Sequence, residues 1–140
     1  MAQGPWPAAA GLIALTFVMD ASAILAIIRG EAGLEVALHY AQAAAMSAVN
    51  VAEVVTKCIE QDYPEAAALD LIQSSGIEVL PFDEDLAILA GTLRRNAGKG
   101  ILSLGDRACI ATAIRAGATA VTADRVWTTL KLPCTVELIR

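Results

Sequence analysis

The sequence predicts an α/β fold with three layers, in which a five-stranded parallel sheet is flanked by helices. Short apolar runs alternate with helix-compatible segments along the chain, which is the pattern of consecutive βαβ units. More than half of the 140 residues are apolar, whereas only 4% are aromatic. A chain of this length and composition is expected to form one domain whose core packs small side chains between helices and a sheet.

Five apolar runs are predicted to be the strands. The first, residues 12–19, is continuously apolar and ends at Asp20, as expected of a strand that is buried on both faces. The other predicted strands are residues 45–49, 77–80, 118–123 and 135–139. We expect residues 1–12, with their Gly-Pro-Trp-Pro stretch, to be an irregular extension ahead of a domain that spans residues 13–140.

Helices are predicted between the strands from apolar spacing and from residues that start or stop a helix. Gly30, Gly76 and Gly117 end three of them, and Pro64 starts the one that Gly76 ends. Glu53 lies almost opposite the apolar stripe of its helix. The predicted helices are residues 22–28, 31–44, 50–60, 65–74, 83–95, 103–116 and 125–130.

The net charge of −5 is unevenly distributed. Residues 1–85 hold two basic and twelve acidic residues, whereas residues 86–140 hold eight basic and three acidic ones. The acidic total argues against a protein that coats nucleic acid nonspecifically. The basic residues of the second part are consistent both with a local phosphate-binding surface and with ordinary solvated helix faces.

The sequence also predicts a cytoplasmic protein. Its apolar stretch, residues 8–19, is shorter than the roughly 20 residues that span a bilayer, and no basic residue precedes Arg29 as in a secretory signal. Three cysteines in apolar surroundings are typical of buried thiols in a reducing compartment. They indicate no disulfide or zinc site, and the single histidine, His39, receives no role.

Four carboxylates, Asp20, Glu53, Asp106 and Asp124, lie at or just inside predicted element boundaries. The carboxyl ends of parallel strands share one edge of a sheet, and ligands bind outside that edge. We therefore expect these four residues, which are scattered over a hundred positions, to form one cluster.

Helix capping is an alternative explanation for each acid. Asp20 and Asp124 each directly precede a predicted helix start. Glu53 follows Asn50 at the spacing of a capping box.

Asp106 has the same capping-box spacing from Ser103, but it also lies on the apolar stripe of its helix. Because a cap should face solvent, we interpret Asp106 as an inward-facing carboxylate that needs a partner or a cation.

Clustered carboxylates repel one another, and a hard divalent ion relieves that repulsion. Oxygen ligands without histidine or cysteine select Mg²⁺ or Mn²⁺. Such ions polarise a phosphoryl oxygen, activate water and stabilise a leaving oxygen, as phosphodiester hydrolysis requires.

Four segments resemble the four motifs of PIN-domain ribonucleases, and within that family the chain looks most like the VapC toxins of type II toxin-antitoxin systems. They are FVMDASA (17–23), SAVNVAEV (47–54), LGDRAC (104–109) and VTADRVW (121–127), and the closing VELIR (136–140) fits as well. The resemblance implies an acidic pocket that binds Mg²⁺ or Mn²⁺ and cleaves RNA. Asp20 and Asp106 would be the principal metal ligands, and Glu53 and Asp124 would complete the pocket.

The resemblance has further implications. Ser22 and Thr122 match hydroxyl positions that orient carboxylates or a water, although we favour simple roles as a helix start and a strand end. Arg107 and Arg125, which directly follow pocket acids, are candidate contacts for RNA phosphate. The family implies a homodimer and a cognate antitoxin, a small DNA-binding protein whose C-terminal segment lies across the toxin. The first dozen residues depart from the family's compact start.

The leading hypothesis is an endoribonuclease in which a metal-activated water attacks a backbone phosphate in line and leaves 5′-phosphate and 3′-hydroxyl ends. One alternative is a catalytically inactive PIN-fold domain that binds RNA or protein. Another is an aspartyl-phosphate enzyme, since Asp20 ends a first strand. The neighbouring residues argue against it, because such phosphatases need a second Asp where Ser22 stands, and a receiver domain needs an acidic pair and a late lysine.

Overall fold

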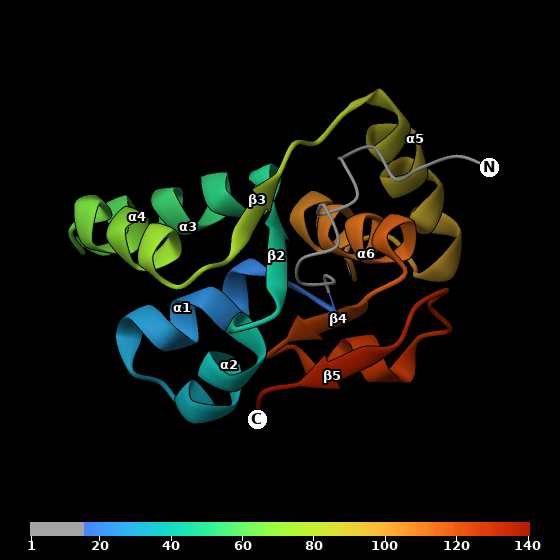
Figure 1. Cartoon of the computed structure of the whole chain (residues 1–140). Coiled ribbons are helices and arrows are strands. Elements are labelled where there is room, and N and C mark those ends of the chain that lie inside the picture. Colours follow the sequence, from blue (N-terminus) through green and yellow to red (C-terminus); the bar gives the residue numbers. More distant parts are fainter. Residues whose placement is uncertain (1–15) are drawn as a thin grey trace, which may run out of the picture.

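The computed structural model describes residues 16–140, in which five short strands form one sheet. The strands are β1 (Phe17–Met19), β2 (Ala44–Ser47), β3 (Glu78–Leu80), β4 (Thr119–Thr122) and β5 (Val136–Leu138). Their order is β3-β2-β1-β4-β5 and every pair is parallel, so the predicted five-stranded parallel sheet is confirmed (Figure 1). The predicted extension, residues 1–12, and the beginning of the predicted first strand lie outside the described residues.

Helices connect the strands and cover the sheet. They are α1 (Ala21–Arg29), α2 (Leu34–Ala41), α3 (Ala48–Glu60), α4 (Glu65–Ser74), α5 (Glu84–Thr92) and α6 (Leu104–Ala116), with 3-10 turns η1 (Leu93–Asn96) and η2 (Arg125–Thr129). No helix within residues 16–140 combines the length and the apolar character that a membrane crossing requires.

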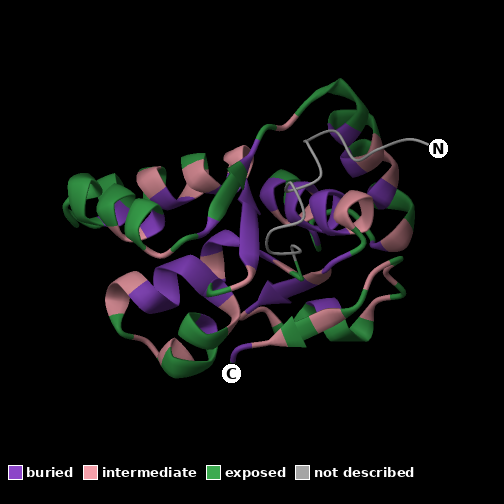
Figure 2. Ribbon diagram, in the orientation of Figure 1, coloured by how far each residue is buried: buried purple, intermediate pink, exposed green. Residues whose placement is uncertain are grey.

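The core consists of two apolar clusters, one on each side of the sheet. Side chains of a strand alternate between its faces, so Val18 and Met19 of β1 belong to different clusters, as do Ala120 and Val121 of β4. Helices α1 to α4 contribute to the cluster of Met19, and α5 and α6 to the cluster of Val18. Figure 2 shows that β2 and most of β4 are buried, whereas the edge strand β3 is mostly exposed and β5 is intermediate to exposed.

The sheet has its switch point between β1 and β4. From β1 the chain continues outward through β2 to β3, and it then returns to the other side of β1 to form β4 and β5. In sheets of this kind the crevice for a ligand opens beyond the carboxyl ends of the strands at that point. Here those ends are occupied by Asp20, directly after β1, and by Thr122, the last residue of β4.

Two predicted boundaries were wrong near the second strand. The helix predicted for residues 31–44 ends at Ala41, and α3 begins at Ala48 where we expected the strand to continue to residue 49. The alanine-rich stretch before Met46 fits a helix and a buried strand equally well by propensity alone. Ser47 decides the start of α3, because its Oγ accepts a hydrogen bond from the Val49 N–H at 3.1 Å.

Two later helices were also predicted imperfectly. The helix expected for residues 83–95 changes to the 3-10 turn η1 after Thr92, and the one expected for residues 125–130 is the 3-10 turn η2. Short helical segments of this length often adopt 3-10 geometry because few intrahelical bonds favour the wider α-helix.

The central position of α6 leads to a stability prediction. Ile110 of α6 is fully buried in the core, so Ile110→Ala is expected to lower the free energy of unfolding by about 2 to 5 kcal/mol in a urea titration. Ile88→Ala is the matched control, because Ile88 in α5 is 60% exposed and its truncation should change that free energy by less than about 0.5 kcal/mol. Equal effects of the two substitutions would contradict this packing.

Candidate active site

All four predicted acidic residues line one pocket. Its volume is about 180 Å³, and it contains Asp20 after β1, Glu53 in α3, Asp106 in α6 and Asp124 after β4. Lys57, one turn after Glu53, lines the same pocket. The fold therefore brings together side chains that are far apart in the sequence. They meet at the edge of the sheet formed by the carboxyl ends of the strands, as predicted.

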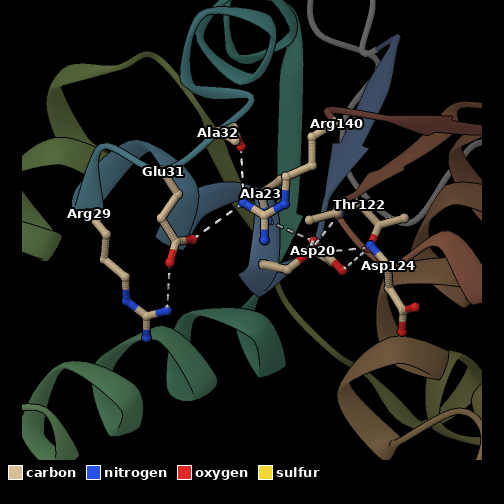
Figure 3. A network of polar contacts seen from close by, with 10 residues as sticks. Asp20, Ala23, Arg29, Glu31, Ala32, Thr122, Asp124 and Arg140 are labelled. Atoms are coloured by element: carbon tan, nitrogen blue, oxygen red, sulfur yellow. Dashed lines mark hydrogen bonds and ion pairs between the residues drawn. The ribbon is translucent and has the colours of Figure 1, made fainter.

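Asp20 is the most deeply buried of the four, with only 4% of its surface exposed. Its Oδ1 accepts hydrogen bonds from Ser22 Oγ at 2.7 Å and from the Ala23 N–H at 2.9 Å, and its Oδ2 accepts one from Thr122 Oγ1 at 2.6 Å. The Ala23 contact also makes Asp20 the N-cap of α1. Figure 3 shows this carboxylate beside Thr122 and Ala23, with Asp124 next to Thr122.

Ser22 and Thr122 do more than start a helix and end a strand, so our preferred interpretation of them was wrong. Each hydroxyl donates to Asp20 and accepts from a backbone N–H of the β4 end, Ser22 from Ala123 at 2.9 Å and Thr122 from Asp124 at 3.0 Å. A hydroxyl has a single proton, so these acceptor bonds direct both protons to the carboxylate. The two residues fix the position of Asp20 and join β1, α1 and β4 around it.

Burial raises the pKa of Asp20 from 3.8 to about 6, because the charged form loses its water. The hydrogen bonds from Thr122, Ser22 and Ala23 act in the opposite direction, and the nearby charge of Asp106 raises the pKa further. A carboxylate held in this way is ionised at neutral pH at a cost in free energy, which a bound cation would offset.

Asp106 caps its helix, so the interpretation that it resists a capping role was wrong. Its Oδ2 accepts from the Ser103 N–H at 2.9 Å, and its own N–H donates to Ser103 Oγ at 3.1 Å, which completes a capping box at the start of α6. The carboxylate is half-buried rather than enclosed. Burial and the charge of Asp124 still raise the pKa of Asp106, while Ser103 and Arg107 lower it.

Glu53 is not part of a capping box, because Ser47 and not Asn50 is the N-cap of α3. Its Oε1 instead accepts a hydrogen bond of 2.7 Å from the Asn50 side chain. Burial raises the pKa of Glu53, the bond from Asn50 lowers it, and the charges of Asp106 and Lys57 act in opposite directions. The negative charge of Asp106 therefore acts on Glu53, as expected of carboxylates in one pocket.

The remaining predicted residues, Asp124, Arg107 and Arg125, differ in their hydrogen bonds and exposure. Asp124 is the N-cap of η2, and its Oδ1 accepts from the Val126 N–H at 3.0 Å. The Arg107 guanidinium donates to the carbonyl oxygens of Ala90 and Leu102 at 3.1 and 3.4 Å. Arg125 is exposed at the start of η2.

The chemical type of the ligands in the pocket, carboxylate oxygens, suits a hard divalent ion. Its ligands would be carboxylate oxygens, and several of these groups have raised pKa values because they are buried near like charges. Within residues 16–140, however, no three acidic, histidine or cysteine side chains lie close enough together to hold one ion as they stand. An ion held by three of these side chains would require them to move toward one another, whereas Mg²⁺ can also be held by one or two carboxylates together with water.

A larger groove adjoins the acidic pocket. It has a volume of about 470 Å³ between α3 and the start of α6, and it shares Glu53 and Lys57 with the pocket. Its walls include apolar side chains of Val49 and Leu104, and Leu104 is more than half exposed. An elongated ligand bound at the acids has room to continue along this groove.

Sequence reasoning missed three residues around Glu53. Asn50 was considered only as a cap, Gly105 only as a spacer in a motif, and Lys57 only as part of the charge balance. The spacing of Glu53 and Lys57 at i and i+4 was a usable signal for a shared helix face. Nothing local in the sequence indicates that Asn50 and Gly105 meet, since they are 55 positions apart.

Comparisons with known proteins find relatives of this chain. The family model described as PIN domain matches residues 17–131. The VapC ribonuclease Mb2780c of Mycobacterium bovis is 36% identical over 99 residues, which cover 64% of this chain and 76% of that relative. Ribonuclease VapC42 of Mycobacterium tuberculosis matches with the same values.

Solved structures share the fold. The crystal structure of VapC20 from Mycobacterium tuberculosis, a toxin that cleaves the sarcin-ricin loop, has a TM-score of 0.67 and 19% identity, and the match covers 81% of this chain and 94% of that one. The structure of DNA-bound VapBC from Salmonella typhimurium has a TM-score of 0.66 and 20% identity, with 90% and 99% covered. At these identities the likeness concerns the fold alone.

The raised pKa of Asp20 predicts how stability depends on pH. Folding disfavours the charged form, so the free energy of unfolding should fall as pH rises from about 4 to about 6, by up to about 3 kcal/mol for this group. Asp20→Asn removes that charge and keeps a capping side chain. In EDTA the variant should be more stable than the parent protein at pH 7.5, and this gain should disappear near pH 4.

Urea titrations at both pH values measure the effect. Asp70→Asn is the control, because Asp70 is exposed on α4 and should leave the pH dependence unchanged. A stability gain for Asp20→Asn that is the same at pH 4 and pH 7.5 would contradict the assigned burial effect.

Proposed function

This chain belongs to the PIN domain family, and from that premise we propose that it is an endoribonuclease that depends on Mg²⁺ or Mn²⁺ and acts as the toxin of a toxin-antitoxin pair. The observation that carries the proposal is the single pocket in which Asp20, Glu53, Asp106 and Asp124 converge from four separate elements. The relatives that are named ribonucleases support the choice of RNA as substrate.

In this proposal Asp20 and Asp106 are the principal ligands of the ion, and Glu53 and Asp124 complete the set or orient the attacking water. The ion supplies charge stabilisation at the scissile phosphate and lowers the pKa of water. Asp20 contributes a fixed, dehydrated negative charge, because Ser22 and Thr122 hold both of its oxygens. In-line attack on the phosphate leaves 5′-phosphate and 3′-hydroxyl ends.

The alternative is a PIN-fold domain that has lost catalysis and binds RNA or protein. The burial of Asp20 argues against it, because an ionised carboxylate that only caps α1 would be replaceable by Asn or Ser without the cost of burying a charge.

The similar structures support a protein partner for this chain. Several of them are VapBC toxin-antitoxin assemblies, including complexes from Rickettsia felis and Salmonella typhimurium with DNA. We propose a cognate antitoxin for this chain as well, and a homodimer as the functional unit. We also propose that it acts in the cytoplasm, where its RNA substrate would be found.

Removal of the ion or of its first ligand should abolish cleavage. With RNA as substrate, EDTA or the substitution Asp20→Asn should lower kcat by at least about 100-fold, because ion binding contributes several kcal/mol of charge stabilisation to the transition state. Mapping of cleavage ends on total RNA, with Mg²⁺ and with EDTA, measures activity and end chemistry together. Asp70→Asn should cleave as the parent protein does, and undiminished cleavage in EDTA would refute the proposal.

Arg125 offers a test of substrate binding without cleavage. It is exposed and directly follows the pocket residue Asp124, so Arg125→Ala should weaken the binding of single-stranded RNA in EDTA. If it contacts one phosphate, the slope of log affinity against log salt should decrease by about 0.7. Arg94→Ala, at an exposed position in η1, is the control. An unchanged slope would remove Arg125 from the RNA contacts, whereas Arg107 already bonds to backbone carbonyls and stays an untested candidate.

A further inference from the structure

Asn50 is completely buried although it is polar, and its side chain links two different helices. Its Nδ2 donates to Glu53 Oε1 at 2.7 Å within α3 and to the carbonyl oxygen of Gly105 in α6 at 3.1 Å. Gly105 immediately precedes Asp106. The Asn50 amide therefore joins the carboxylate of one pocket acid to the backbone next to another.

The neighbours of this amide dictate its orientation. Glu53 Oε1 and Gly105 O are both acceptors, so only the amino group can face them, and its two protons are both used. Asn50 Oδ1 is consequently buried without a hydrogen-bond partner among the described residues. An unpaired buried acceptor destabilises a fold, and an apolar side chain of similar shape would avoid that loss. Stability alone therefore does not explain asparagine at this position.

Gly105 provides the space that this arrangement needs. A methyl group on its Cα would overlap the carboxyl group of Glu53, which supplies the three atoms nearest to that position. The carboxylate is the end of a flexible side chain, so a methyl group would displace it and leave the backbone of α6 in place. Glu53 thus packs directly against the first turn of α6, where any larger residue would exclude it.

We propose that Asn50 and Gly105 are positioning residues that hold the Glu53 carboxylate against α6, beside Asp106. Asn50 directs the carboxylate through one hydrogen bond and ties it to α6 through another, and Gly105 leaves the room for it. The inference rests on the proposed function, because a fixed Glu53 matters only if the pocket binds a divalent ion. It deepens that function by assigning the orientation of one ligand to two residues that are not themselves ligands.

The test uses Asn50→Leu, which keeps the branched shape of the side chain and removes both donors, and Gly105→Ala, which keeps Asn50 and displaces the carboxylate. Each should weaken Mn²⁺ binding, measured by titration calorimetry without RNA, by about 10- to 100-fold, as is usual when the partner of a ligand is removed. Each should lower kcat for RNA cleavage more than it changes KM. Thr112→Val is the matched control, since it removes a buried hydroxyl whose bond to Ala108 O lies within α6 and away from the pocket.

A double-mutant cycle separates positioning from general support of the fold. If Asn50 acts through Glu53, then Asn50→Leu should have no further effect on Mn²⁺ affinity in a Glu53→Gln background. Additive losses would overturn the proposal and leave Asn50 a structural link between α3 and α6. Unchanged Mn²⁺ affinity in Gly105→Ala would also overturn it, and this variant carries the test if Asn50→Leu does not fold. Failure of the proposed function looks different, because the parent protein itself would then neither bind Mn²⁺ nor cleave RNA.

Discussion

The burial of the Asp20 carboxylate is the constraint on which the rest of the site depends. Its three hydrogen bonds come from the first turn of α1 and from the end of β4, so the same contacts that place the charge also join the two central strands to a helix. Thr122 is fully buried, and the switch point of the sheet is closed around it. Loss of the Ser22 or the Thr122 hydroxyl would remove a hydrogen bond from the buried charge of Asp20. It would also remove one of the bonds that connect Asp20 to the end of β4.

Capping and metal binding are compatible roles for these acids because they use different oxygens. Asp106 accepts its capping bond at Oδ2, Asp124 accepts its bond at Oδ1, and Glu53 accepts the Asn50 bond at Oε1. Each of these bonds uses one acceptor site of one oxygen, so the carboxylate keeps further acceptor sites for a ligand. A carboxylate offers about four acceptor sites, so even Asp20, with three bonds, retains one at Oδ2. A role as a helix cap therefore does not exclude a role as a metal ligand for these acids.

The sequence was sufficient for the sheet, for the convergence of the acids and for most helices, because these follow from periodicity and from the geometry of parallel strands. It indicated an inward-facing carboxylate only at Asp106, whereas Asp20 is the more deeply buried of the two. Asp106 lies on an apolar stripe, but a stripe specifies direction and not depth, and the first turn of α6 lies at the rim of the pocket. Asp20 is deeper because β4 and α1 enclose it, which only the strand order determines. The meeting of Asn50 with Gly105 likewise depends on how α3 packs against α6.

The four acids differ in how firmly they are held, and this difference indicates which of them depends on neighbouring side chains for its position. Asp20 is fixed by bonds from three groups, and Asp106 and Asp124 are each tied to a backbone N–H at a helix start. Glu53 has the longest side chain and is held by a single side-chain bond, from Asn50. The described acids form no ready group of three ligands, and this separation keeps like charges apart. Because Glu53 is the least constrained of the four, its place beside α6 depends on the bond from Asn50 and on the space that Gly105 leaves.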